Sequence, residues 1–180
     1  MTGLVVAVVV LAVAAVVTIY LVWLGGRHDR LTARTDGAWA ALDAQLARRA
    51  AAALGLAQLR TDVSVLGAAE VVLQAAGETA PSDERQDAEN ALGRSLRRAG
   101  YEELDPASGP ALLPELRASA QRVLLARQFH NDAVRDLQAL RNRPAARLGR
   151  WGRGGTQRYF EIDDTVLTGV VRQGQTPPGT

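Results

Sequence analysis

The stretch GLVVAVVVLAVAAVVTIYLVWL, residues 3–24, contains no charged residue and no proline, and 14 of its 22 residues are Leu, Ile or Val. A helix of this length measures about 33 Å, close to the ~30 Å hydrocarbon core of a bilayer. Since lipid offers the backbone no hydrogen-bonding partner, the segment has no alternative to helix there, despite the modest helix propensity of Val. The sequence therefore predicts a transmembrane signal-anchor over residues 1–26.

The residues that flank this stretch set its orientation. Tyr20 and Trp23 lie at its C-terminal end, where aromatic side chains favour the headgroup level. Arg27, Arg30 and Arg34 follow, whereas no Lys or Arg precedes the stretch. The positive-inside rule then places the N-terminus outside and the rest of the chain in the cytoplasm. We therefore expect a single-pass protein of the cell membrane.

A cleaved signal peptide is the alternative interpretation of the same stretch. Such a peptide begins with a basic region, has an apolar core of about 7–15 residues and ends at a small-x-small cleavage site. The chain lacks the basic region and a convincing cleavage site, and its apolar run is too long. These differences favour an uncleaved anchor.

Residues 27–148 show the spacing of amphipathic helices rather than that of strands. The first helix is expected from His28 to about Gly77, with its larger apolar side chains on one stripe. Glycine weakens a helix by up to about 1 kcal/mol relative to alanine. Gly55 therefore leaves open whether this helix is unbroken or turns near residues 50–56.

Two further helices are expected after a clear stop at GETAPS, residues 77–82. Ser82 is placed to cap a helix from about Asp83 to Ala99, which Gly100 ends. A longer helix follows a loop that contains two prolines and runs from about Ala111 to Arg143. The fold class is therefore all-α, an N-terminal transmembrane helix followed by an elongated antiparallel up-and-down bundle. The bundle has four helices, or three if the first is unbroken.

Three blocks of sequence stand in order behind the anchor: DGAWAALDAQLARR at residues 36–49, ARQFHNDAVR at 126–135 and RYFE at 158–161, with ENAL at 89–92 as a weaker fourth. In wording and spacing they resemble the LemA family of bacterial membrane-anchored helical proteins. The chain departs from the family after the first block, where AAAALGLAQL replaces a sequence with Pro-Asn-Leu-Val. It departs again at His130, where Tyr is usual.

The resemblance implies an N-terminal span that carries a LemA-like helical bundle on the cytoplasmic side, without established enzymatic activity. Some relatives are associated with membrane remodelling. Genes for membrane proteases often accompany the family, so a membrane protease is a candidate partner. Properties that depend in the family on the Pro turn or the Tyr hydroxyl are not carried over to this chain.

Polar residues interrupt the apolar stripe of the last helix at Arg127, His130 and Asn131, and Asp43 or Arg48 of the first helix is expected to face them. Two interpretations stay open. We favour a polar layer that fixes the register of the bundle, and the other is a site for lipid or a small ligand. A metal site lacks donors, because the chain has two His and no Cys. The sequence shows no catalytic group or cofactor motif.

Residues 149–180 are predicted to form a basic, aromatic segment followed by a flexible C-terminal tail. The candidate contacts with the membrane surface are Arg147, Arg150, Trp151 and Arg153. Each basic group near anionic headgroups contributes about 1 kcal/mol, and Trp favours the interface. A solvated tail is the alternative, and the nearly balanced net charge of +2 disfavours nucleic acid binding. Only a bundle of four helices would return this segment to the membrane.

These observations favour a non-enzymatic, membrane-anchored helical scaffold or adaptor. Its expected partners are the lipid bilayer and either another protein or a second copy of the chain. The alternative function is a membrane-associated sensory or regulatory module that binds lipid or a small ligand at the central polar layer. No cofactor is expected for either function.

Overall fold

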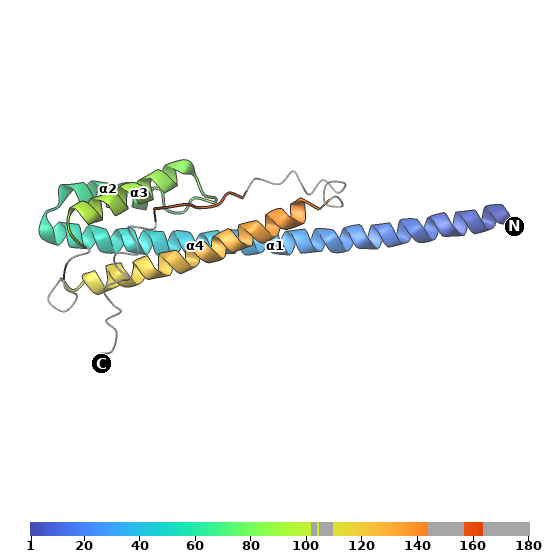
Figure 1. Ribbon diagram of the computed structural model, residues 1–180, viewed down its shortest axis with the longest axis horizontal. Helices are drawn as coiled ribbons and strands as arrows, with labels where there is room; N and C mark the ends of the chain where they lie inside the picture. The colour runs from blue at the N-terminus through green and yellow to red at the C-terminus, as the bar shows by residue number, and fades with distance from the viewer. Residues whose placement is uncertain (102–103, 105–109, 144–156, 164–180) are drawn as a thin grey trace, which may run out of the picture.

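The computed structural model describes residues 1–101, 104, 110–143 and 157–163. These residues form four α-helices and no β-strand, which confirms the all-α fold class. The helices are α1 (Thr2–Arg60), α2 (Val63–Gln74), α3 (Asp83–Arg98) and α4 (Leu113–Arg141). In Figure 1, α1 extends far beyond the other three helices, which gather around its C-terminal half.

The helices alternate in direction along the bundle. Leu24 of α1 packs against Leu140 at the end of α4, whereas Gly55 near the end of α1 approaches Leu112 at the start of α4. α2 turns back along α1, and α3 returns beside α2 (Figure 1). The expected up-and-down bundle of four helices is therefore confirmed.

The break that separates the first two helices lies later in the sequence than expected. α1 continues through residues 50–56, so a turn there is wrong. Gly55 is instead a point of close packing, because a Cβ atom at this position would lie 2.7 Å from Cδ1 of Leu112. The helix ends where Thr61 adopts a left-handed conformation with φ 57°. Asp62 then caps α2 by accepting hydrogen bonds from the amides of residues 64 and 65 at 3.1 and 3.3 Å.

The boundaries of the later helices agree with the capping signals in the sequence. The Ser82 hydroxyl accepts a hydrogen bond from the amide of Arg85 at 3.0 Å and begins α3. Gly100, with φ 69°, follows the end of α3 as a left-handed glycine. The last helix is about two residues shorter at each end than the sequence suggested.

α1 contains the one stretch of the described chain that is long and apolar enough to cross a membrane, and none of this stretch is buried against other residues. Leu24 is the first residue of α1 to enter the core, with 1% of its surface exposed. A core helix of a soluble protein would be covered by its neighbours. The apolar half of α1 has no such cover from the described residues.

The core of the bundle divides into two main clusters. The first lies where α1 meets α2 and α3, and includes Leu56, Val65 and Leu92. The second joins α1 to α4 and includes Trp39 and Val123. This second cluster also contains Phe160 and Ile162, which follow α4 in the sequence.

Candidate functional site

Four charged side chains form a buried network between α1 and α3. Nη2 of Arg85 lies 2.8 Å from Oδ1 of Asp43 and 3.6 Å from Oε1 of Glu89. Arg49 forms an ion pair with the same Glu89. The other oxygen of Asp43 accepts a hydrogen bond from the amide of Gly77 at 2.8 Å. None of these four residues is more than 9% exposed.

This network pairs two positive with two negative side chains, so it buries no net charge. Desolvation opposes the attraction within such a network, but removing one member leaves a buried charge without its partner. Its role is therefore to hold α1, α3 and the turn between α2 and α3 together. Asp43 belongs to this network and does not join the polar layer at His130, where the sequence placed it.

The segment 157–163, hereafter the strap, crosses the bundle in an extended conformation. Phe160 is fully buried, and its ring centroid lies 5.4 Å from that of Trp39. The backbone of Phe160 is held by the amide of Asn131. Oδ1 of Asn131 accepts from the Phe160 N–H at 3.0 Å, and Nδ2 donates to the Phe160 carbonyl at 3.2 Å. One side chain thus satisfies both polar groups of a buried residue.

On its other side the strap binds α3. The guanidinium of Arg158 donates to both oxygens of Asp83, at 2.7 and 3.0 Å. The amide of Glu161 donates to Oε1 of Gln86 at 2.9 Å, and that of Asp163 donates to Oδ1 of Asn90 at 2.9 Å. Side-chain carbonyls of α3 therefore accept the backbone hydrogen bonds that a neighbouring β-strand would accept in a sheet. Because α3 and α4 scarcely contact each other among the described residues, the strap is what links them.

His130 lies under the strap with none of its surface exposed. Its Nε2 is 3.1 Å from the carbonyl oxygen of Arg158, so this nitrogen carries the proton of the neutral ring and donates it. Burial lowers the pKa of His130 below its ordinary value of 6.5, and the nearby carbonyls of Arg158 and Thr35 only partly oppose this effect. The ring also contacts Trp39, at a centroid distance of 5.5 Å.

A cavity of about 140 Å³ opens beside His130. It is bounded by Thr35, Asp36 and Trp39 of α1, by the turn before α3 and by Gln157 of the strap. The described part of the chain contains no group of three His, Cys, Asp or Glu side chains that could hold a metal ion. The cavity is a small hollow lined by both polar and apolar groups, with Trp39 as its aromatic wall.

The structure divides the polar residues that the sequence grouped together. His130 and Asn131 meet at the strap, as neighbours on α4. Arg127 is half-buried and lines a shallow hollow at the surface, which it shares with Asn131 and Arg135. Sequence reasoning missed Arg49, although it interrupts the apolar stripe of α1 in the same way that Arg127 interrupts that of α4.

The four basic and aromatic residues proposed to touch the membrane, Arg147, Arg150, Trp151 and Arg153, lie outside the described residues, as does the tail after residue 163. The two ends of the segment that contains them are described. Nη2 of Arg141 lies 3.2 Å from Oε1 of Gln157, and Gln157 donates to Oδ1 of Asp36 at 3.1 Å. Arg141 follows Leu140, which packs against Leu24 where α1 enters the core, whereas Gln157 lies beside Asp36, about 18 Å further along α1.

Comparison of the chain with protein-family models, with curated proteins and with solved structures finds no match. The resemblance to the LemA family therefore remains a prediction that rests on the sequence blocks alone.

The buried neutral state of His130 leads to a prediction about pH. The unfolded chain binds a proton at this side chain near the ordinary pKa of 6.5, whereas the folded chain binds it only at a lower pH. The contribution of neutral His130 to the free energy of unfolding is therefore fully present above pH 6.5. It is lost as the pH falls from 6.5 through the lowered pKa. We expect the urea midpoint to decrease between pH 7.5 and pH 5.5.

The matched variants for this experiment are His130→Gln and His28→Gln, which each remove one of the two histidines. The decrease should shrink in His130→Gln and persist in His28→Gln. An equal decrease in the wild type and in His130→Gln would show that another group carries the dependence.

Proposed function

We propose that this chain is a membrane-anchored, non-enzymatic helical scaffold or adaptor of the LemA type. The observation that carries the proposal is the continuity of α1, which runs without a break from the uncovered apolar stretch into the core of the bundle. Aliphatic side chains contribute about 1.5–3 kcal/mol each when they leave water. An uncovered helix that carries 13 of them before Leu24 is thus far more stable in lipid than in water.

An unbroken helix also fixes the position of the bundle relative to the membrane. Trp39 follows Leu24 by 15 residues, so it lies about 22 Å further along the helix axis. Such a rod presents the sides of the bundle at constant heights above the bilayer. This property suits a scaffold, because partners in the same membrane meet those sides at a defined level.

The use of the buried polar groups also supports a binding role over a chemical one. The two arginines of the buried network neutralise its two carboxylates, and the amide of Asn131 is occupied by the backbone of the strap. These groups hold helices and strap in place. They therefore stabilise the shape that a partner would recognise.

The proposal is tested by crosslinking in intact membranes after the sidedness of the protein has been established by protease protection. A scaffold should yield homo-oligomers or a stoichiometric partner, such as a membrane protease. Recovery of the monomer alone would contradict the scaffold role. Digestion of residues 28–180 from outside the cell would overturn the cytoplasmic placement, and extraction of the chain by alkaline carbonate would overturn the anchor.

We further propose that the segment between α4 and the strap touches anionic headgroups. Its support is the position of Arg141, which ends α4 next to Leu140, the residue that packs against Leu24 at the foot of the apolar stretch. In nanodiscs with brominated lipid, Trp151 should be quenched more strongly in anionic than in neutral bilayers. Replacing the arginines at positions 147, 150 and 153 with serine should reduce this difference. Each replacement should lower the affinity of the segment for anionic bilayers by about fivefold.

Trp23→Phe is the background for this measurement, since it removes the tryptophan within the apolar stretch. Trp39 remains, but it is 3% exposed and well above the bilayer in the proposed orientation. Adding Trp151→Phe should abolish the quenching. Equal quenching in anionic and neutral bilayers would contradict the electrostatic contact.

The second candidate function is a sensory module that binds a small ligand, and the cavity beside His130 favours it. A ligand in this cavity would contact the strap through Gln157 and so bias whether the strap stays bound. A screen of small polar molecules by thermal shift tests the idea. A hit that shifts the wild type and His130→Gln equally would place its binding elsewhere, and Arg127→Ala tests the neighbouring surface hollow in the same assay.

A further inference from the structure

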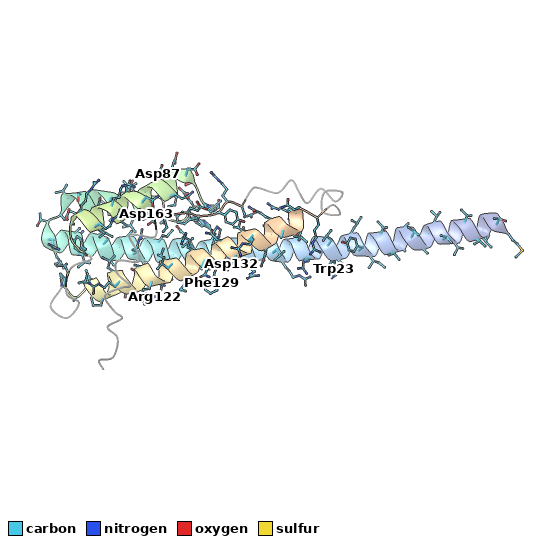
Figure 2. The ribbon with its side chains drawn as sticks, viewed as in Figure 1. Trp23, Asp87, Arg122, Phe129, Asp132 and Asp163 are labelled. Carbon is cyan, nitrogen blue, oxygen red and sulfur yellow. The ribbon has the colours of Figure 1, made fainter. Side chains whose placement is uncertain are left out.

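One side of the bundle exposes large apolar side chains from α4 next to small ones from α1. Phe129 is 65% exposed and Leu125 is 57% exposed. In Figure 2, Phe129 and Arg122 lie along the edge of the bundle opposite Asp87. We call this side the lateral face, and it consists of Ala38, Ala41, Gln45, Arg122, Leu125, Ala126 and Phe129.

The lateral face contains both a projection and a hollow. A depression of about 250 Å³ lies between α1 and α4. Ala38 and Ala41 line it with side chains no larger than a methyl group, and Phe129 stands at its edge. An aromatic ring from another molecule could therefore enter the depression without displacing a large side chain.

The projection and the hollow lie at the same level along the bundle. Thr35 of α1 donates a hydrogen bond to the carbonyl of Ala133 on α4, and the ring of Trp39 contacts that of His130. Phe129 precedes His130, so it is level with the part of α1 that contains Ala38 and Ala41. A partner with a ring at this same level would fit the hollow.

Membrane anchoring makes this coincidence of level significant. Two copies that enter one bilayer in the same direction can be related by a two-fold axis only along the membrane normal, which is the direction of a span. In such a pair each residue meets the partner at its own level, and the same patch is used twice. We propose that two copies of this chain pack side by side through the lateral face, with Phe129 of each copy in the hollow of the other.

The size of the patch favours a second anchored copy over a soluble partner. Phe129 and Leu125 together offer on the order of 200–300 Å² of apolar surface, whereas a stable complex in solution buries about 800 Å² on each side. Two copies held in one membrane have already lost much of the freedom that association removes. The inference thus rests on the anchoring in the proposed function.

The charged residues of α4 around the patch do not oppose the pairing. Nη1 of Arg122 lies 3.3 Å from Oε1 of Glu115. Nη2 of Arg135 lies 3.2 Å from Oδ1 of Asp132 on the same helix. Each exposed charge at the rim of the patch on α4 is thus accompanied by its opposite within the same copy. A charged residue that meets the same residue of the other copy across the two-fold axis is therefore already paired with an opposite charge in its own copy.

Single-cysteine crosslinking of the full chain in membranes tests the proposal directly, because the native chain contains no cysteine. Oxidation of Phe129→Cys or Leu125→Cys should give a band at twice the 19.2 kDa of the chain. Asp87→Cys, on the opposite edge in Figure 2, is the control and should give little of it. No such band from positions 125 and 129, or an equal band from position 87, would overturn the proposal.

A charge in the patch provides a second test, read out through Leu125→Cys. Adding Phe129→Glu should lower the yield of dimer by about tenfold, since a carboxylate resists burial in an apolar hollow. Val71→Glu, at a 53% exposed site on α2, is the matched control and should leave the yield unchanged. Equal yields in both variants would refute the pairing, and thermal melts establish that both variants are folded.

These outcomes separate the pairing from the scaffold role. A crosslink from position 129 to a different protein would refute the pairing and support the scaffold. Loss of the chain from the membrane fraction would refute the anchoring on which both depend.

Discussion

Replacing Arg85 with methionine should lower the free energy of unfolding of the bundle by about 3–5 kcal/mol, the loss that follows when one member of a buried ion pair is removed. Arg85 is fully buried and lies between Asp43 and Glu89. Without it, Arg49 is the only positive charge left in the network, against two carboxylates. Methionine fills a similar volume, so the loss reports the missing charge and hydrogen bonds rather than a cavity.

Urea denaturation of the full chain in nanodiscs, followed by circular dichroism, measures this loss. Arg94→Met is the matched control, because Arg94 is an exposed arginine on the same helix. It should change stability by no more than about 0.5 kcal/mol. A wild-type midpoint for Arg85→Met would contradict this prediction and would mean that the network contributes less to stability than its geometry indicates.

The regular parts of this fold could be predicted because their signals are local. The apolar run before Leu24 predicts, through its length and composition, an uncovered helix that is long enough to cross a membrane. Ser82 and Gly100 mark the ends of α3 through capping and left-handed geometry, and both signals act within a few residues. The apolar stripe of α4 required only the helical period. Each of these features is determined by a stretch of fewer than about 30 consecutive residues.

The features that sequence reasoning missed depend on contacts between distant segments. Gly55 reads as a helix breaker when only its own propensity is considered, but its lack of a side chain admits Leu112. Asp62, by contrast, is a local capping signal at the true break. The partners of Asp43 could not be chosen from sequence, since Arg85 lies 42 residues away.

The strap shows the same limit. Its sequence shows neither helical nor strand periodicity. Its backbone forms hydrogen bonds with the side chains of Asn131, Gln86 and Asn90 rather than with a neighbouring strand. In the sequence, the block RYFE at residues 158–161 is distinguished only by its resemblance to the LemA family. Only the structure shows that Phe160 is a core residue of the bundle.

The strap gives the second large effect that we expect, in the variant Phe160→Ala. Truncation of a buried phenylalanine typically lowers stability by about 3–5 kcal/mol, through lost apolar burial and the cavity that remains. Phe160 is fully buried and contacts Trp39, so the loss should fall in this range. Much of it should appear as release of the strap, because the strap is short and Phe160 is its most buried residue.

Limited trypsin digestion distinguishes release of the strap from unfolding of the bundle. In the native chain Arg158 is bound to Asp83, within a strap that lies against two helices. Phe160→Ala should accelerate cleavage after Arg158 while α4 stays intact. Tyr159→Ala is the control, since Tyr159 is 37% exposed and its hydroxyl donates to Oε1 of Gln138 at the surface. If both variants were cleaved at Arg158 as slowly as the wild type, the strap would be held by its hydrogen bonds and Phe160 would not be its anchor.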